Sequence, residues 1–129
     1  MQPHVTRIQV RWTDIDTLGH VTHSVVFAYL DEARDELLRS LVGDVEAWPN
    51  VVAHAAADFR RELPRSLREV FVRTRIVEVG RSSVRFEQEI LGPDGEAAVE
   101  AKAVLVAWDP VERRARAIGD DERGRLAGG

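Results

Sequence analysis

One segment with helical spacing stands among segments that alternate as β-strands do, and this order narrows the possible folds. Between Thr22 and about Leu41, apolar residues recur every three or four positions. They are Val26, Leu30, Ala33, Leu37 and Leu41, which fall on one side of a helix. Thr22 suits the position that caps the start of a helix, and Gly43 suits the position just past its end. We therefore predict one long amphipathic helix over residues 22–41.

The rest of the chain predicts strands joined by tight connections. The alternating segments are residues 5–12, 51–61, 67–79, 83–91 and 97–108. Residues 80–82 form a turn, and the Gly-Pro-Asp-Gly run at 92–95 is typical of a hairpin. This order predicts a single α+β domain over residues 1–129, in which one antiparallel sheet of about five strands wraps around one helix. From about residue 111 we expect a partly ordered tail with a short helix at 120–126.

A single helix covers only one face of such a sheet. Part of the remaining apolar surface then needs a second copy of the chain, so we expect a homodimer or a homotetramer. At 129 residues the chain is long enough to bury a core of ordinary size.

Composition excludes several classes of function. With 18 basic and 22 acidic residues, the formal net charge is −4, which argues against a nucleic-acid partner. The chain has no cysteine, which rules out disulfides and thiolate metal sites. Its first residues lack the pattern of a secretion signal, and no apolar run approaches the roughly 18 residues that span a bilayer. We expect a soluble cytoplasmic protein without a metal or a cofactor.

The connection before the predicted helix carries the clearest chemical signal. Asp14 and Asp16 lie just after a strand-like segment, Gly19 allows the chain to reverse, and the helix begins near His23. A carboxylate can activate water or attack a carbonyl carbon, and the free N–H groups at a helix start can hold the carbonyl oxygen. From the residues alone, Asp16 serves equally well as a carboxylate that only caps a turn.

At this point the sequence resembles the hotdog-fold acyl-CoA thioesterases related to 4-hydroxybenzoyl-CoA thioesterase. Their signature is an Asp-x-Asp-x-x-Gly-His-Val run after a strand, two polar residues, and a helix carrying Tyr-Leu, two acidic residues and Ala-Arg. Here these stand at residues 12–23 and 29–34. The run Phe-Arg-Arg-Glu-Leu-Pro at 59–64 and Val-Gly-Arg-Ser-Ser at 79–83 also look similar. The resemblance implies the hotdog fold over residues 5–108.

The resemblance also implies roles for individual residues. It makes Asp16 the catalytic carboxylate, as general base or nucleophile, and makes the backbone N–H of His23 the donor to the thioester oxygen. Many members have Asn-Asn where this chain has Thr22-His23. A histidine at position 23 occurs in one bacterial branch, where its imidazole is implicated in catalysis. Asp14 is expected to stabilise the turn, and His20 to pack beneath the loop.

Acyl-CoA binding would extend outward from this point. The acyl group is expected along the helix near Val25, Val26 and Tyr29. Arginines suit the phosphates of CoA, and serines can bond its pantetheine or phosphate groups. These candidates are Arg60, Arg61, Arg65, Arg81, Ser82 and Ser83. His54 lies in an apolar strand and is expected to be a core histidine.

The resemblance leaves other activities open. The nearest alternative is a thioesterase that acts on acyl carrier protein, whose acidic surface would also attract arginines. A non-catalytic acyl-CoA-binding protein of the same fold has no need of Asp16 or Gly19, and a hydratase matches the Asp-x-Asp-x-x-Gly run less well. We therefore expect hydrolysis of an acyl-CoA to a free acid and CoA.

Overall fold

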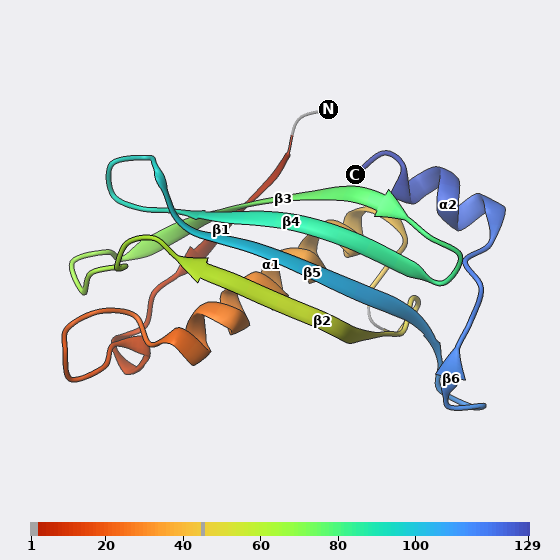
Figure 1. Ribbon diagram of the computed structural model, residues 1–129, viewed down its shortest axis with the longest axis horizontal. Helices are drawn as coiled ribbons and strands as arrows, with labels where there is room; N and C mark the ends of the chain where they lie inside the picture. Colours follow the sequence, from red (N-terminus) through yellow and green to blue (C-terminus); the bar gives the residue numbers. More distant parts are fainter. Residues whose placement is uncertain (1–2, 45) are drawn as a thin grey trace.

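The computed structural model describes residues 3–44 and 46–129, in which one long helix lies across one face of an antiparallel sheet (Figure 1). The elements in chain order are β1 (His4–Gln9), the 3₁₀ turn η1 (Trp12–Asp14), α1 (His23–Leu41), β2 (Asn50–Phe59), β3 (Glu69–Val79), β4 (Ser83–Leu91), β5 (Ala97–Asp109), β6 (Arg114–Ala115) and α2 (Asp120–Leu126). The strands follow the order β1-β3-β4-β5-β2, and the short β6 pairs with the end of β5. The predicted α+β architecture is confirmed.

The predicted helix is confirmed as α1. Its stripe buries Val26, Leu30, Ala33 and Leu37 against the sheet. Beyond its last residue, the N–H groups of Val42 and Gly43 donate to the Leu38 carbonyl at 2.8 and 3.2 Å. Gly43 has φ +106°, a conformation that favours glycine, so it ends the helix as the sequence predicts.

The core between α1 and the sheet consists of two apolar clusters. The first lies near the start of α1 around Val26 and Leu30, and the second near its end around Leu37 and Trp48. Buried polar side chains lie between α1 and the sheet along this core. Arg34 donates to Gln88 at 2.8 Å, and Gln88 donates to the Leu30 carbonyl at 2.9 Å. These bonds tie α1 to β4 through paired polar groups, and the Arg34 Nε stays buried without a partner among the described residues.

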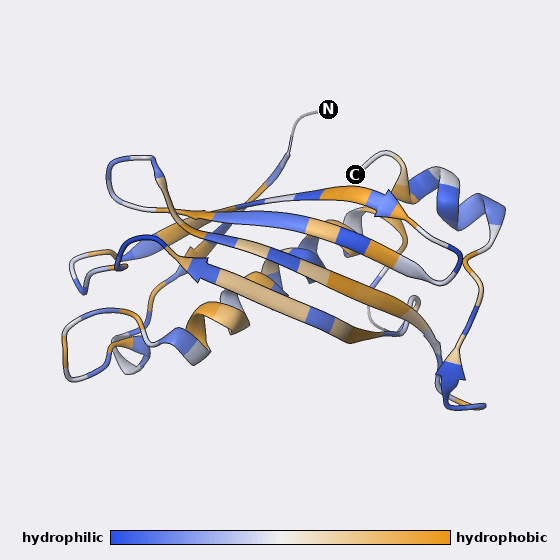
Figure 2. Cartoon of the chain, viewed as in Figure 1, coloured by the Kyte–Doolittle hydropathy of each residue, from blue (hydrophilic) through white to orange (hydrophobic). Residues whose placement is uncertain are grey.

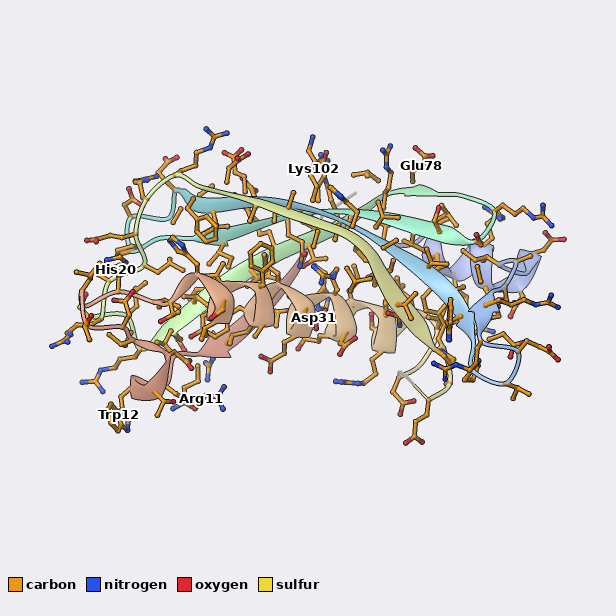
Figure 3. The ribbon with its side chains drawn as sticks, turned by 60° about the horizontal axis from the view of Figure 1, so that its bottom comes forward. Arg11, Trp12, His20, Asp31, Glu78 and Lys102 are labelled. Carbon is orange, nitrogen blue, oxygen red and sulfur yellow. The ribbon has the colours of Figure 1, made fainter. Side chains whose placement is uncertain are left out.

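The two faces of the sheet differ in character. Lys102 and Glu78 project from the face that points away from α1 (Figure 3). On that face, cross-strand ion pairs join Arg73 to Glu89 at 2.9 Å and Arg75 to Glu87 at 2.6 Å. This face therefore carries charges suited to water, beside the exposed apolar side chains of Val5 and Phe71.

The edge strand β2 presents an exposed, mostly apolar surface. Its residues 51–56 are all exposed, and along much of its length it is coloured as hydrophobic (Figure 2). Val52 is 50% exposed. His54 is also exposed, so the expectation of a core histidine is wrong. The sequence pattern could not show this because an edge strand and a central strand carry similar apolar runs.

The first strand is shorter than the sequence predicts. β1 ends at Gln9 instead of residue 12, because the chain turns into η1, where the Asp14 carboxylate accepts the Arg11 N–H at 3.0 Å. As a result Trp12 is 86% exposed. Figure 3 shows Arg11 and Trp12 projecting outward beside the start of α1.

The C-terminal segment continues as ordered structure from β6 into α2, where the sequence suggests only partial order from residue 111. The short helix falls on residues 120–126 as predicted. Leu126 and Ile118 are buried in the second apolar cluster. Two apolar anchors in an Arg- and Asp-rich segment are too few to produce a periodic signal, so the sequence does not indicate that Ile118 and Leu126 pack into this cluster.

Glu122 is the polar centre that holds α2 in place. Its carboxylate accepts two hydrogen bonds from Arg116 at 2.8 and 2.7 Å and one from the Trp48 indole N–H at 2.6 Å. The N–H of Gly119 also donates to it at 2.9 Å. The Arg116 guanidinium is the largest cause that lowers the pKa of Glu122, to about 2 from an ordinary 4.5.

Replacing Glu122 with glutamine is therefore expected to lower the free energy of unfolding by about 1–2 kcal/mol at neutral pH. A depressed folded-state pKa stabilises the protein above the unfolded value of 4.5, and this stability is lost as the pH falls through about 2. Urea unfolding at pH 7 and near pH 3 should show a gap between wild type and variant that narrows at the lower pH. Glu112→Gln, at an exposed carboxylate of the same tail, serves as control. A gap that does not change with pH would contradict the role of Glu122.

Candidate functional site

The connection between β1 and α1 is anchored by a buried aspartate. Asp14 is 4% exposed and accepts a hydrogen bond from the Tyr29 hydroxyl at 2.6 Å. Its backbone carbonyl accepts the Thr22 N–H at 3.0 Å, which ties the loop to the start of α1. Burial is the main cause that raises the pKa of Tyr29, so its hydroxyl remains a protonated donor. Asp14 thus stabilises the turn, the role that the sequence predicts for it.

Asp16 lies two residues further, in a tight turn. Its Oδ1 accepts the Leu18 N–H at 2.9 Å and the His20 N–H at 3.5 Å. Gly19 has φ +86° and lets the chain reverse beneath the carboxylate. Partial burial acts to raise the pKa of Asp16, but the backbone hydrogen bonds from Leu18 and His20 outweigh it and the pKa is lowered. The side chain is therefore an ionised carboxylate at neutral pH.

The helix start beyond this turn presents free backbone donors. Thr22 occupies the cap position as predicted, but its side chain makes no capping hydrogen bond. The Val25 and Val26 N–H groups donate to the Thr22 carbonyl. Within residues 3–44 and 46–129, the N–H groups of His23 and Ser24 have no acceptor. These are the groups that could hold a developing oxyanion, reinforced by the helix dipole.

A cavity of about 250 Å³ opens beside the start of α1. Its lining combines apolar side chains with histidine, arginine and glutamate: His20, Val21, His23, Val26, Phe59, Arg60, Arg61, Glu62, Leu63 and Val99. Asp16 is not itself a lining residue, but its carboxylate accepts the His20 N–H, and His20 lines the cavity. In Figure 3, His20 lies at this end of the molecule.

The structure brings three of the predicted arginines to this end of the sheet. Arg60 and Arg61 line the cavity, and the Arg65 N–H donates to the Gly19 carbonyl at 2.9 Å. Arg61 also forms an ion pair with Asp94 of the β4–β5 hairpin. Arg60 is 57% exposed in its side chain and lies 3.6 Å from Glu100. Both arginines remain on the surface, where a phosphate could reach them.

The structure does not bring Arg81, Ser82 and Ser83 to the same place within one chain. They lie where β3 connects to β4, with Ser83 as the first residue of β4, at the opposite end of the sheet from the start of α1 (Figure 1). Phe59, beside α1, pairs with Val99, whereas Ser83 pairs with Val106 seven residues along β5. At the rise of a strand this separation is on the order of 20 Å.

The candidates along α1 differ in exposure. Val26 is buried and lines the cavity, whereas Val25 is half-buried. Tyr29 is 2% exposed and uses its hydroxyl for Asp14, so it lies beneath the loop. Sequence reasoning missed Phe59 and Val99 as neighbours of His23. In the sequence Phe59 stands in the Phe-Arg-Arg-Glu-Leu-Pro run, but the pairing between β2 and β5 is a property of the topology and leaves no local signal.

Comparison with known proteins identifies the family. A family model described as the thioesterase-like superfamily matches residues 10–124. The chain belongs to the thioesterase-like superfamily. No curated protein matches the chain in sequence. The predicted relationship to thioesterases and the predicted hotdog fold are therefore confirmed, and thioester hydrolysis is the general class of reaction.

Solved structures of several bacterial proteins are closely similar to this chain. A thioesterase from Thermus thermophilus, complexed with coenzyme A and zinc, is 33% identical, with a TM-score of 0.87 and 98% of each chain covered. A putative thioesterase from Pseudomonas aeruginosa is 27% identical, with a TM-score of 0.86, 98% of this chain covered and 99% of the other. A Staphylococcus aureus protein in complex with CoA, 14% identical with a TM-score of 0.86, covers 99% of this chain and 85% of its own and shares the fold.

Two further features concern metals and membranes. In the described part of the chain, no group of three or more histidine, aspartate or glutamate side chains is arranged to hold a metal ion. Neither helix of that part has the length and apolar character that crossing a bilayer requires.

Proposed function

We propose that the protein hydrolyses an acyl-CoA thioester to a free acid and CoA. The observation that carries this proposal is the loop from Asp16 to His23. It holds an ionised carboxylate and leads directly into the unpaired N–H groups that open α1, at the rim of a partly apolar cavity. This pairing of a base with oxyanion donors meets the two needs of thioester hydrolysis.

Asp16 can act by either of two routes that need the same geometry. As a general base, it takes a proton from water while the oxygen adds to the carbonyl carbon. As a nucleophile, its own oxygen adds to that carbon, and water then cleaves the resulting anhydride. In both routes the negative charge gathers on the carbonyl oxygen near the His23 N–H, the C–S bond breaks, and CoA leaves as a thiolate that takes up a proton. A donor of this kind stabilises the transition state by about 3 kcal/mol.

The substrate would extend from the cavity over the basic rim. The acyl group would lie against Val26, with Val25 just before it and Tyr29 further along α1. Arg60 and Arg61 line the cavity, Arg65 bonds to Gly19 of the neighbouring loop, and all three suit the phosphates of CoA. Arg61 would exchange its partner Asp94 for a phosphate when CoA binds.

We further propose that two copies of the chain pair through β2. This strand is an edge of the sheet, and residues 51–56 are exposed and mostly apolar. A long exposed edge of this kind is a template for pairing with another strand. Antiparallel pairing around a two-fold axis would reverse the second sheet, so that Arg81, Ser82 and Ser83 of the partner subunit would lie at the end where α1 begins.

Placing a charge near the centre of β2 is expected to separate the two copies. In a two-fold pairing, Ala55→Asp would bring two aspartates close together, and like charges opposite each other destabilise a strand pair. Sedimentation should give a dimer of the 14.5 kDa chain for wild type and a monomer for the variant. Val111→Asp adds the same charge at another exposed position and should remain dimeric. A monomeric wild type, or a dimeric Ala55→Asp protein, would refute this interface.

Release of CoA from a panel of acyl-CoA esters tests the reaction directly. Because the chain has no cysteine, a thiol reagent detects the released CoA without a background from the protein. We expect turnover with at least one acyl-CoA, faster than with the same acyl group on acyl carrier protein. Preference for the carrier protein would reassign the substrate. Binding of acyl-CoA without release would favour a non-catalytic binding protein.

A further inference from the structure

An aromatic stack holds the side chain of His23. Phe59 is the last residue of β2 and His23 the first residue of α1, and their ring centroids lie 4.2 Å apart with planes inclined by 30°. Phe27 lies one helical turn after His23 and meets Phe59 edge-on, at 6.3 Å and 68°. Phe59 is 39% exposed in the single chain, so its ring is not enclosed by the core and packs against His23 and Phe27 at the surface.

The stack is the contact that orients the imidazole. His23 is exposed, and neither ring nitrogen has a hydrogen-bond partner among the described residues. An exposed histidine without such a partner would exchange between rotamers on a nanosecond timescale. Stacking against Phe59 restricts these rotamers and leaves both nitrogens available at the cavity.

We propose that Phe59 is a positioning residue. It holds the His23 imidazole at the mouth of the cavity, so that a ring N–H can donate a hydrogen bond to the departing sulfur. This rests on the proposed hydrolysis of acyl-CoA. Phe27 supports the arrangement by packing against the edge of the Phe59 ring. Because Phe59 belongs to β2 and His23 to α1, the stack also couples the edge strand to the helix start.

The stack itself is tested without any substrate. The chain has four histidines, so the His23 ring C–H signals in a proton NMR spectrum are assigned by their loss in His23→Asn. In wild type these signals should be shifted by the ring current of Phe59. The shift should persist in Phe59→Tyr, which keeps a ring, and vanish in Phe59→Leu, which keeps only apolar bulk. An unchanged His23 signal in Phe59→Leu would overturn the proposal.

Kinetics then test what the stack does. Phe59→Leu is expected to lower kcat about tenfold with little change in KM, since a displaced catalytic group slows chemistry more than binding. Phe59→Tyr should retain most of the wild-type kcat. In a His23→Asn background, Phe59→Leu should change kcat less than about twofold, because coupled residues do not act additively. An equal loss in both backgrounds would overturn the proposal. If wild type released no CoA, the proposed function would fail, and the NMR measurement would still decide whether Phe59 orients His23.

Discussion

Replacing Asp16 with asparagine is expected to slow CoA release at least about a hundredfold, since a carboxylate that activates water or attacks the thioester has no substitute in an amide. Asparagine has nearly the same shape, and its side-chain oxygen can still accept the N–H groups of Leu18 and His20. The turn is therefore preserved in the variant. Steady-state release of CoA at saturating acyl-CoA measures the loss.

This substitution separates the two interpretations of Asp16. A carboxylate that only caps the turn would be replaced by asparagine at little cost to activity. Asp44, at the far end of α1, provides a matched control, because its Oδ1 also accepts two backbone N–H groups, those of Glu46 and Ala47, both at 3.1 Å. Asp44→Asn should leave the rate unchanged. Equal rates for wild type and Asp16→Asn would remove Asp16 from the chemistry.

Replacing Asp14 with alanine is expected to lower the free energy of unfolding by about 3 kcal/mol, because it leaves one buried and one partly buried donor without their charged acceptor. These donors are the Tyr29 hydroxyl and the Arg11 N–H. The same change should loosen the loop that carries Asp16 and reduce CoA release by about tenfold. Urea unfolding followed by circular dichroism gives the stability.

The contribution of the pair between Asp14 and Tyr29 follows from a double-mutant cycle. In a Tyr29→Phe background the buried hydroxyl is absent, so Asp14→Ala should cost less than in wild type, by about 1 kcal/mol or more. Tyr29 is the only tyrosine of the chain, so loss of its absorbance change on unfolding confirms the variant. Additive costs would show that the two residues stabilise the protein independently.

The main elements of this fold could be predicted from the sequence because each has a strong local signal. The stripe from Val26 to Leu41 has helical spacing, and Gly43 marks the end of α1 at a positive φ. The strand over residues 83–91 alternates along its whole length and matches β4 at both ends. Exposure could not be predicted in the same way. His54 and the alanines around it form an apolar run that is typical of an interior strand. The topology instead places β2 at an edge of the sheet, where these residues are exposed.

The candidate site was partly accessible from the sequence for a related reason. Asp14, Asp16 and Gly19 lie within one short loop, so their grouping is local, and the unpaired N–H groups follow from the helix that begins at His23. Phe59 reaches His23 only because β2 returns past the start of α1. Arg81 lies at the far end of the sheet because β3 has to run its full length before it turns.

The most direct measurement of the central claim is a crystal structure of the Asp16→Asn variant with an acyl-CoA bound, because this variant should bind its substrate without cleaving it. We expect the acyl carbonyl oxygen to accept the His23 N–H and the side chain of residue 16 to lie beside the carbonyl carbon. A thioester bound with its carbonyl carbon away from both groups would contradict the account.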